Sequence, residues 1–179
     1  SMLSVACDWS CSDVVQLIKT RYIDFGDTVD ADLLEQIIIK SGVRAGRSSW
    51  DEKLDRFVFG MKASYGIAMT DKSEDALQKM REDIILIEDA CNKLREFLSV
   101  LDCFTGVGTL ADYSDLLLKC LEKFGFEKSI RDNMSEPYEG LMRQELEGYA
   151  RIKELLRELK TADSLFQNPE LSIREFAGI

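Results

Sequence analysis

Apolar residues recur every three or four positions along most of this chain, which is the spacing of one face of an α-helix. The longest such run follows Ser73 and ends at Leu101, with steps of three and four alternating without interruption. Its members are Leu77, Met80, Ile84, Ile87, Cys91, Leu94, Leu98 and Leu101. At about 1.5 Å per residue this helix is on the order of 40 Å long. We interpret it as the spine of an intramolecular bundle, with an intermolecular coiled coil as the alternative.

Six further segments combine helical spacing with start or stop signals, namely 12–22, 31–41, 49–66, 109–124, 135–166 and a start at 172. Residues 126–134 have room for one short turn. Residues 1–11 show no period, so we predict an extension there and a single helical domain over 12–179. The predicted fold class is all-α, an irregular bundle of six or seven helices framed by two long antiparallel helices, 73–101 and 135–166.

The expected helix starts carry capping residues. Asp30 precedes the second helix, and Ser49 with Glu52 forms a capping box, as do Thr109 with Asp112 and Ser172 with Glu175. Ser135 begins the second long helix, with Pro137 in its first turn. The apolar stripes predict the packed core, which comprises Trp50, Leu54, Phe57, Leu77, Ile84, Ile87, Leu94, Leu98, Tyr113, Leu117, Tyr149 and Ile152.

Composition supports a globular helical chain and excludes several kinds of active site. The chain has 179 residues, of which 45% are hydrophobic and 31% charged, with only two prolines and eleven glycines to form turns. The absence of histidine removes the commonest general base and most zinc sites. The net charge of −10 has the sign opposite to that of a free-standing nucleic-acid binder. We therefore predict no catalytic residue, metal ligand or cofactor in this segment.

The five cysteines are odd in number and scattered, which favours free thiols in a reducing cytoplasm. No apolar run approaches the roughly 20 residues of a membrane span, so no membrane partner is expected. Glu158-Leu159-Lys160 matches half of a metal-nuclease motif, but a helix rich in Glu and Lys produces such matches on its solvated face.

One loop is a candidate for anion binding. Arg44 and Arg47 stand just before a predicted helix start, where free backbone N–H groups also favour negative charge. We therefore take Arg44 and Arg47 as candidate contacts to phosphate or DNA. The alternative is that both arginines pair with neighbouring carboxylates.

Several segments, taken in order, resemble landmarks of one protein family. They are Val14 to Tyr22, Asp32-Leu33-Leu34-Glu35, Ser41 to Trp50 followed by Leu54, Leu94 to Leu98, Thr109 to Leu117, Phe124-Gly125-Phe126 and Leu171 to Phe176. The family comprises the AddB/RecB-type subunits of ATP-dependent exonucleases of the AddAB and RecBCD kind. Its members have a superfamily-one helicase scaffold and usually a C-terminal PD-(D/E)XK nuclease domain.

The resemblance implies that this chain is the helical, 2B-like accessory region of such a subunit. The parent protein would use ATP and Mg²⁺ to unwind and degrade double-stranded DNA ends in recombination and repair. Its partners would be the remainder of the parent polypeptide, the second helicase–nuclease subunit and DNA. No catalytic residue is carried over, because the family's ATP and nuclease motifs lie outside these segments. A well-capped helix that starts at Ser172 also suggests a fragment, so we expect the reading frame to continue past Ile179.

Two other functions remain open at this stage. A free-standing helical protein could bind partners or dimerise through the Leu77–Leu101 stripe. A small cytosolic helical enzyme would need a deep pocket lined by acids with displaced pKa values.

Overall fold

The computed structural model describes residues 2–20, 22–23, 25, 29–133, 139–166 and 170–178. These residues are mainly helical, with one pair of two-residue strands, so the predicted all-α class is confirmed. They group into two compact units, where the sequence predicted one domain over 12–179. Unit 1 comprises Ser1–Cys7, Thr20–Asp24 and Ser99–Ile179, and unit 2 comprises Asp8–Lys19 and Phe25–Leu98.

Unit 2 contains α2 (Cys11–Ile18), α3 (Ala31–Ser41), α4 (Arg47–Ala68) and most of α5 (Glu74–Leu101). The predicted ends of α3 are confirmed. The Asp30 carboxylate accepts a 2.7 Å hydrogen bond from the Leu33 N–H, and Gly42 ends the helix at φ +70°. This φ lies in the left-handed region, which a glycine adopts without steric cost.

The start of α4 differs from the prediction. The helix begins at Arg47 after Gly46 and has no side-chain cap, so the capping box expected at Ser49 is wrong. The backbone of the preceding loop explains the shift. Cys11 N–H donates to the Arg44 carbonyl at 2.7 Å, and Gly46 N–H donates to the Asp8 carbonyl at 3.2 Å. These bonds fix the backbone at Gly46, so the N-cap position of the helix lies three residues before the predicted cap at Ser49.

Trp50 anchors the core of unit 2. Its side chain is fully buried, and its indole N–H donates a 2.9 Å hydrogen bond to the Trp9 carbonyl. Trp9 has φ +52°, a conformation that costs a non-glycine residue roughly 1–2 kcal/mol. Other apolar side chains of unit 2 are also essentially buried, namely Leu34, Ile37, Ile38, Leu54, Leu94 and Leu98.

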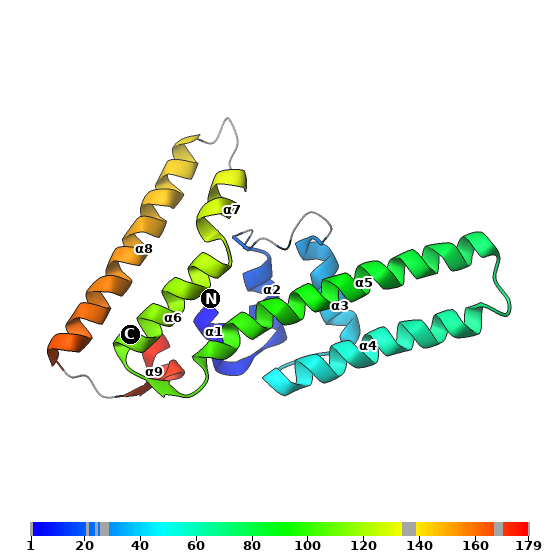
Figure 1. The fold of residues 1–179 in the computed structure, drawn as a ribbon, viewed down its shortest axis with the longest axis horizontal. Coiled ribbons are helices and arrows are strands. Elements are labelled where there is room, and N and C mark those ends of the chain that lie inside the picture. The colour runs from blue at the N-terminus through cyan, green and yellow to red at the C-terminus, as the bar shows by residue number, and fades with distance from the viewer. Residues whose placement is uncertain are drawn as a thin grey trace. The chain divides into compact units, whose positions relative to one another are not determined.

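Helices α4 and α5 form an antiparallel hairpin (Figure 1). The ion pairs show that the two helices run in opposite directions. Asp55 pairs with Arg95 and Lys62 pairs with Glu88, so residue numbers rise along α4 as those of their partners fall along α5. Helices α5 and α8 (Glu139–Phe166) are the two longest of the described residues. Each lies beside a shorter helix: ion pairs link α5 to α4, and α8 packs on α6 (Leu110–Lys123).

Unit 1 contains most of α1 (Met2–Asp8), together with η1 (Asp102–Phe104), β1 (Val107–Gly108), α6, α7 (Phe126–Asn133), α8, β2 (Leu171–Ser172) and α9 (Ile173–Ala177). Helix α1 corrects the expected extension over 1–11. Its Val5 side chain is fully buried, but seven residues are too few to display a helical period. Helix α7 likewise adds to the six or seven helices expected.

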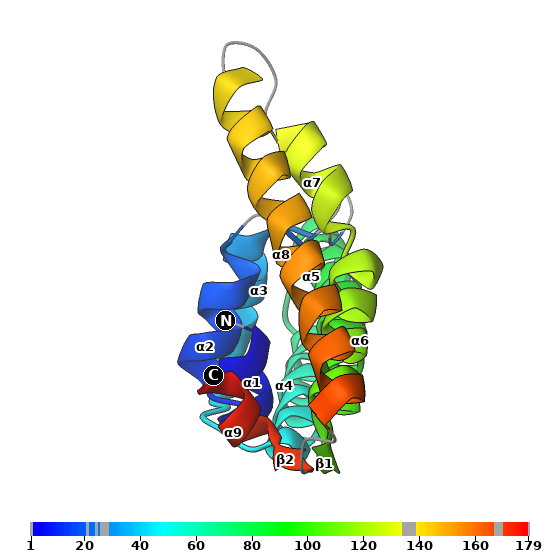
Figure 2. The ribbon, with the colours of Figure 1, turned by 90° about the vertical axis from the view of Figure 1, so that its left-hand side faces the viewer.

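Tyr113 holds together the small sheet of unit 1, in which Val107 of β1 lies opposite Ser172 of β2 (Figure 2). The Tyr113 hydroxyl lies 3.0 Å from the Gly106 carbonyl and 3.1 Å from the Leu171 carbonyl. Its ring stacks on Phe176 of α9 with centroids 5.0 Å apart. One side chain of α6 thus joins two segments that are distant in sequence.

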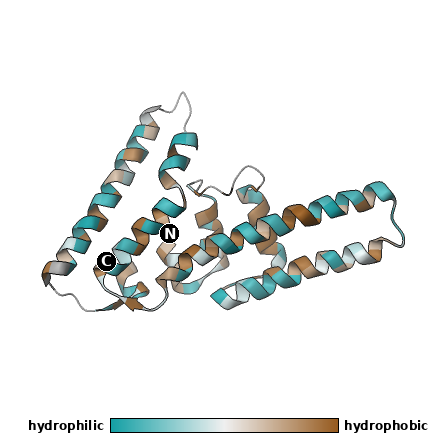
Figure 3. Cartoon of the chain, viewed as in Figure 1, coloured by the Kyte–Doolittle hydropathy of each residue, from teal (hydrophilic) through white to brown (hydrophobic). Residues whose placement is uncertain are grey.

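The α6–α8 pair is amphipathic, with apolar and polar residues alternating along each helix (Figure 3). Buried residues of unit 1 include Leu121, Ile130, Tyr149 and Leu156. Ile152, predicted to lie in this core, is 49% exposed, so that prediction is wrong. The inward position is taken by Lys153, whose ammonium lies 4.2 Å from the Tyr149 ring centroid and pairs with Glu127. One step along a helix turns a side chain by about 100°, which directs Ile152 outward.

The remaining predicted core residues are distributed as follows: Trp50, Leu54, Ile84, Leu94, Leu98, Tyr113 and Tyr149 are buried, and Phe57, Leu77, Ile87 and Leu117 are half-buried. The capping boxes at Thr109 and Ser172 are both formed. The predicted start at Ser135 with Pro137 lies outside the described residues.

The Thr109 capping box makes stability depend on pH. The Asp112 carboxylate accepts a 2.9 Å hydrogen bond from the Thr109 N–H, which lowers the pKa of Asp112 below its ordinary value of 3.8. A lowered folded-state pKa stabilises the chain above that ordinary value, and the contribution is lost as the pH falls through the folded value. Asp112→Asn should therefore destabilise the chain more at about pH 7 than at about pH 3, because part of the contribution of the carboxylate is lost below its ordinary pKa of 3.8. Urea denaturation at the two pH values tests this, and an equal difference at both would contradict it.

Trp50→Phe should destabilise the chain, because it leaves the Trp9 carbonyl buried without its donor and opens a void. We expect a loss of about 1–3 kcal/mol for the carbonyl, plus a cavity term. Guanidinium unfolding followed by far-ultraviolet circular dichroism measures the effect. Phe59→Leu is the control, since Phe59 is 73% exposed and its change should stay within about 0.5 kcal/mol. Equal stability of Trp50→Phe and the natural chain would refute the role of Trp50.

Candidate functional site

The arginine loop before α4 has a structural role. The Arg47 guanidinium makes a 2.8 Å ion pair with Asp51 and lies 5.5 Å from the centroid of the Trp9 ring. These contacts favour the alternative of carboxylate pairing for Arg47. The Arg44 carbonyl accepts the hydrogen bond from Cys11, while its side chain is exposed. The two arginines predicted as one anion site therefore have different environments, and the contacts of Arg47 serve the fold.

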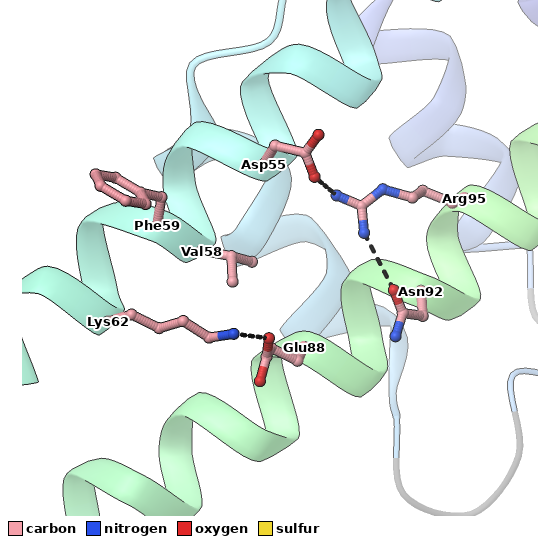
Figure 4. Close-up of a pocket in the computed structure, with 7 residues that line it drawn as sticks. All are labelled: Asp55, Val58, Phe59, Lys62, Glu88, Asn92 and Arg95. Carbon is pink, nitrogen blue, oxygen red and sulfur yellow. Dashed lines mark hydrogen bonds and ion pairs between the residues drawn. The ribbon is translucent and has the colours of Figure 1, made fainter.

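The α4–α5 hairpin provides the most developed surface feature of unit 2. A cleft of about 290 Å³ lies between the two helices, with charged residues facing one another across it (Figure 4). Its lining comprises Asp55, Val58, Phe59, Lys62, Glu88, Asn92 and Arg95. Phe59 stands apart from the charged pairs in this view and is 73% exposed.

Each carboxylate of this cleft is matched by a cation from the opposite helix. Arg95 lies 2.5 Å from Asp55 and also donates a 3.1 Å hydrogen bond to Asn92, while Lys62 lies 2.5 Å from Glu88. Exposed pairs of this kind contribute only about 0–1 kcal/mol each. Their main effect here is to fix the register of the hairpin. Carboxylates neutralised in this way are not arranged as an acid–base pair.

A second and larger groove lies along the same hairpin. It encloses about 530 Å³ and has a mainly apolar lining. Its residues are Arg56, Phe57, Gly60, Met61 and Ser64 of α4 with Met80, Asp83 and Ile84 of α5. Gly60 leaves this groove open, because a Cβ placed there would meet no atom within 4 Å apart from its own helix backbone. The groove is thus a surface that the two helices do not fill themselves.

Exposed apolar side chains continue along the hairpin. Phe59 and Ile67 are each 73% exposed, and with the exposed Ala63 they follow at steps of four, which places them on one face of α4. Met69, Ile85 and Leu86 are further exposed apolar residues of this hairpin. Apolar groups gathered on one surface are typical of interaction sites.

Sequence reasoning missed this surface. It placed Trp50, Leu54 and Phe57 of α4 in the predicted core and identified no second apolar face on this helix. A signal was present, because Phe59, Ala63 and Ile67 form a second stripe with the same period. Two stripes on one helix indicate two packed faces, of which the described chain covers one.

The thiols of Cys91 and Cys120 are buried in the protein. Burial raises the pKa of Cys91 to about 11, and burial together with the neighbouring Cys103 raises the pKa of Cys120 to about 12. Within the described residues no group of three or more Cys, Asp or Glu side chains is arranged to hold a metal ion. No described helix is both long enough and apolar enough to cross a membrane.

Comparison with protein-family models, with curated proteins and with solved structures gave no match for this chain.

Two glycines of α4 provide a test of the open groove. Gly60 and Gly66 both lie in the helix, are exposed and have no atom within 4 Å of an added Cβ beyond the helix backbone. Gly60→Ala and Gly66→Ala should each stabilise the isolated chain by roughly 0.5–1 kcal/mol, because alanine loses less backbone entropy in a helix. Thermal and urea denaturation measure this gain. A loss of stability at Gly60 alone would show that the groove is closed in solution.

Proposed function

We propose that this chain is the helical accessory region of an AddB/RecB-type subunit of an ATP-dependent helicase–nuclease that processes double-stranded DNA ends in the cytoplasm. In this proposal the chain supplies a docking surface for the second helicase–nuclease subunit and leaves the chemistry to other parts of the complex. The resemblance rests on segments that set helix ends and core anchors, such as Gly42, Trp50 and Thr109. The resemblance therefore supports a shared fold of this region.

The observation that carries the proposal is the open, apolar groove of the α4–α5 hairpin. Helices of 22 and 28 residues are held in register by ion pairs, yet they leave a cavity of about 530 Å³ between Phe57, Met61 and Ile84. Grooves between paired helices accept an amphipathic helix from a partner. The exposed residues Phe59 and Ile67 add further apolar surface elsewhere on α4.

Charge favours a protein over DNA as the direct partner of this surface. The chain carries a net charge of −10, and Glu82 and Asp83 are exposed on α5. Carboxylates repel phosphate. Proteins gain affinity for DNA when basic side chains neutralise phosphates and release the counterions bound to them. DNA would then be held by the rest of the complex.

The ATP and Mg²⁺ implied by the resemblance belong, in this proposal, to the remainder of the parent polypeptide. The described residues of this chain offer no acidic cluster suited to Mg²⁺. No chemical step is therefore assigned to the chain itself.

Dimerisation through the Leu77–Leu101 stripe is a weaker candidate. Ile84, Leu94 and Leu98 of this stripe are at most 9% exposed within a single chain. A coiled-coil seam needs these positions free to enter a partner helix. A dimer would have to use a different surface.

The proposal is tested by titrating the purified chain into the purified AddA-type subunit of the same complex, with heat of binding as the readout. We expect saturable one-to-one binding. Gly60→Gln places a long neutral side chain in the groove and should weaken binding about tenfold or more, a factor of ten corresponding to about 1.4 kcal/mol. Gly66→Gln introduces the same change outside the groove and should leave binding unchanged.

Three results would contradict the proposal. One is a failure of the natural chain to bind the AddA-type subunit. Another is equal binding by the two glutamine variants. A third is tight binding to blunt duplex DNA with a steep salt dependence, which would make nucleic acid the direct partner. Circular dichroism of each variant verifies that the helices are intact.

A further inference from the structure

Two cysteine thiols of unit 1 lie side by side. The Sγ atoms of Cys103 in η1 and Cys120 in α6 are 3.7 Å apart, although 17 positions separate the residues in sequence. Both cysteines are free thiols. Scattered spacing gave no reason to pair them, so this proximity is a product of the fold.

The two thiols differ in their access to solvent. Cys103 is exposed, whereas the Cys120 side chain is 2% exposed and lies 3.8 Å from the Val100 carbonyl. An oxidant in solution can thus reach Cys103, while Cys120 lies directly behind it. Reactive thiols poised beside a resolving cysteine have this arrangement.

We propose that Cys103 and Cys120 form a peroxide-sensitive dithiol that closes into an intrachain disulfide. A disulfide requires an S–S distance of about 2.05 Å, so the sulfur atoms must approach by roughly 1.7 Å. The Cys103 side of the pair is a single turn of 3₁₀-helix, whose hydrogen bonds are weaker than those of an α-helix. A small shift of this turn, or a rotation of the Cys103 side chain, achieves the approach.

The reaction balances with hydrogen peroxide as the oxidant. The Cys103 thiolate attacks one peroxide oxygen, the O–O bond breaks, and Cys103 becomes a sulfenic acid as hydroxide leaves and takes up a proton as water. The Cys120 sulfur then attacks the Cys103 sulfur, the S–O bond breaks, and the Cys120 proton leaves with the second water. Two thiols are oxidised to one disulfide, and one peroxide is reduced to two waters.

The environment of Cys120 supports this order of steps. Burial and the adjacent Cys103 raise the pKa of Cys120 to about 12, so Cys120 stays a thiol at neutral pH. The thiolate is the attacking species, which leaves the first step to the exposed cysteine. The disulfide would then join η1 to α6 and enclose the segment that contains β1.

Peptide mapping of the peroxide-treated full chain tests the proposal. Trypsin cleaves after Lys119, so Cys103 falls in the peptide Glu96–Lys119 and Cys120 in the peptide Cys120–Lys123. After treatment with hydrogen peroxide and blocking of the remaining thiols, we expect these two peptides to be linked and to separate on reduction. Free thiols counted after denaturation should fall by two per chain, and reduction should restore them.

Matched variants assign the reaction to this pair. Cys103→Ser and Cys120→Ala should each abolish the linked peptides, whereas Cys7→Ser should leave them unchanged. Because Cys120 is buried, its variant is first examined by circular dichroism. A second measurement avoids the oxidant altogether: phenylarsine oxide, which bridges two adjacent thiols, should bind the natural chain and lose affinity at least tenfold on Cys103→Ser.

Several outcomes would overturn the proposal. Under peroxide, Cys103 could proceed to a sulfinic acid with Cys120 still a free thiol. Alternatively, Cys103 could form a disulfide between two chains, or the linked peptides could contain Cys7, Cys11 or Cys91 in place of Cys120. Each result would show that the two thiols do not act as one dithiol.

Discussion

The hydrogen bond from the Trp50 indole to the Trp9 carbonyl sets the arrangement on which unit 2 depends. It joins the first turn of α4 to a residue that precedes α2, and it holds Trp9 in a conformation that a free chain would avoid. The Arg47–Asp51 pair and the Arg47–Trp9 contact lie at the same place. Since α4 starts from this fixed base, its later turns can project alongside α5 with few contacts of their own. The start of α4 is therefore held in place by hydrogen bonds and ion pairs, whereas its later turns leave an open groove beside α5.

That openness is the basis of the proposed function. A helix that packed closely on α5 would fill the space beside Gly60, and the described residues do not fill it. The ion pairs of Arg95 and Lys62 keep the helices in register without covering their apolar faces. An apolar groove that also contains the charged residues Arg56 and Asp83 combines a surface that gains from burial with polar groups that set orientation. This combination is typical of a docking element.

The sequence predicted local features better than pairings. The caps at Asp30, Thr109 and Ser172 depend on neighbouring residues, and all three are formed. Lys153, and not Ile152, lies on the inner face of α8, because its ammonium group packs on the Tyr149 ring. A pattern of apolar residues cannot predict such a contact of a charged side chain. The match of α5 with α4, and the meeting of Cys103 with Cys120, arise from tertiary packing. No spacing rule along one chain encodes such contacts between distant residues.

The interleaving of the two units along the chain has a consequence for biosynthesis. Unit 2 is complete once Leu98 has been made, whereas unit 1 draws on Ser1–Cys7, Thr20–Asp24 and everything from Ser99 onward. At about 5–20 residues per second, the ribosome needs on the order of 4–16 seconds to deliver the rest. During that interval the apolar side chain of Val5 has no finished core to enter. Until residues 99–179 follow, the apolar residues of α1 stay exposed on the growing chain, where a chaperone can bind them.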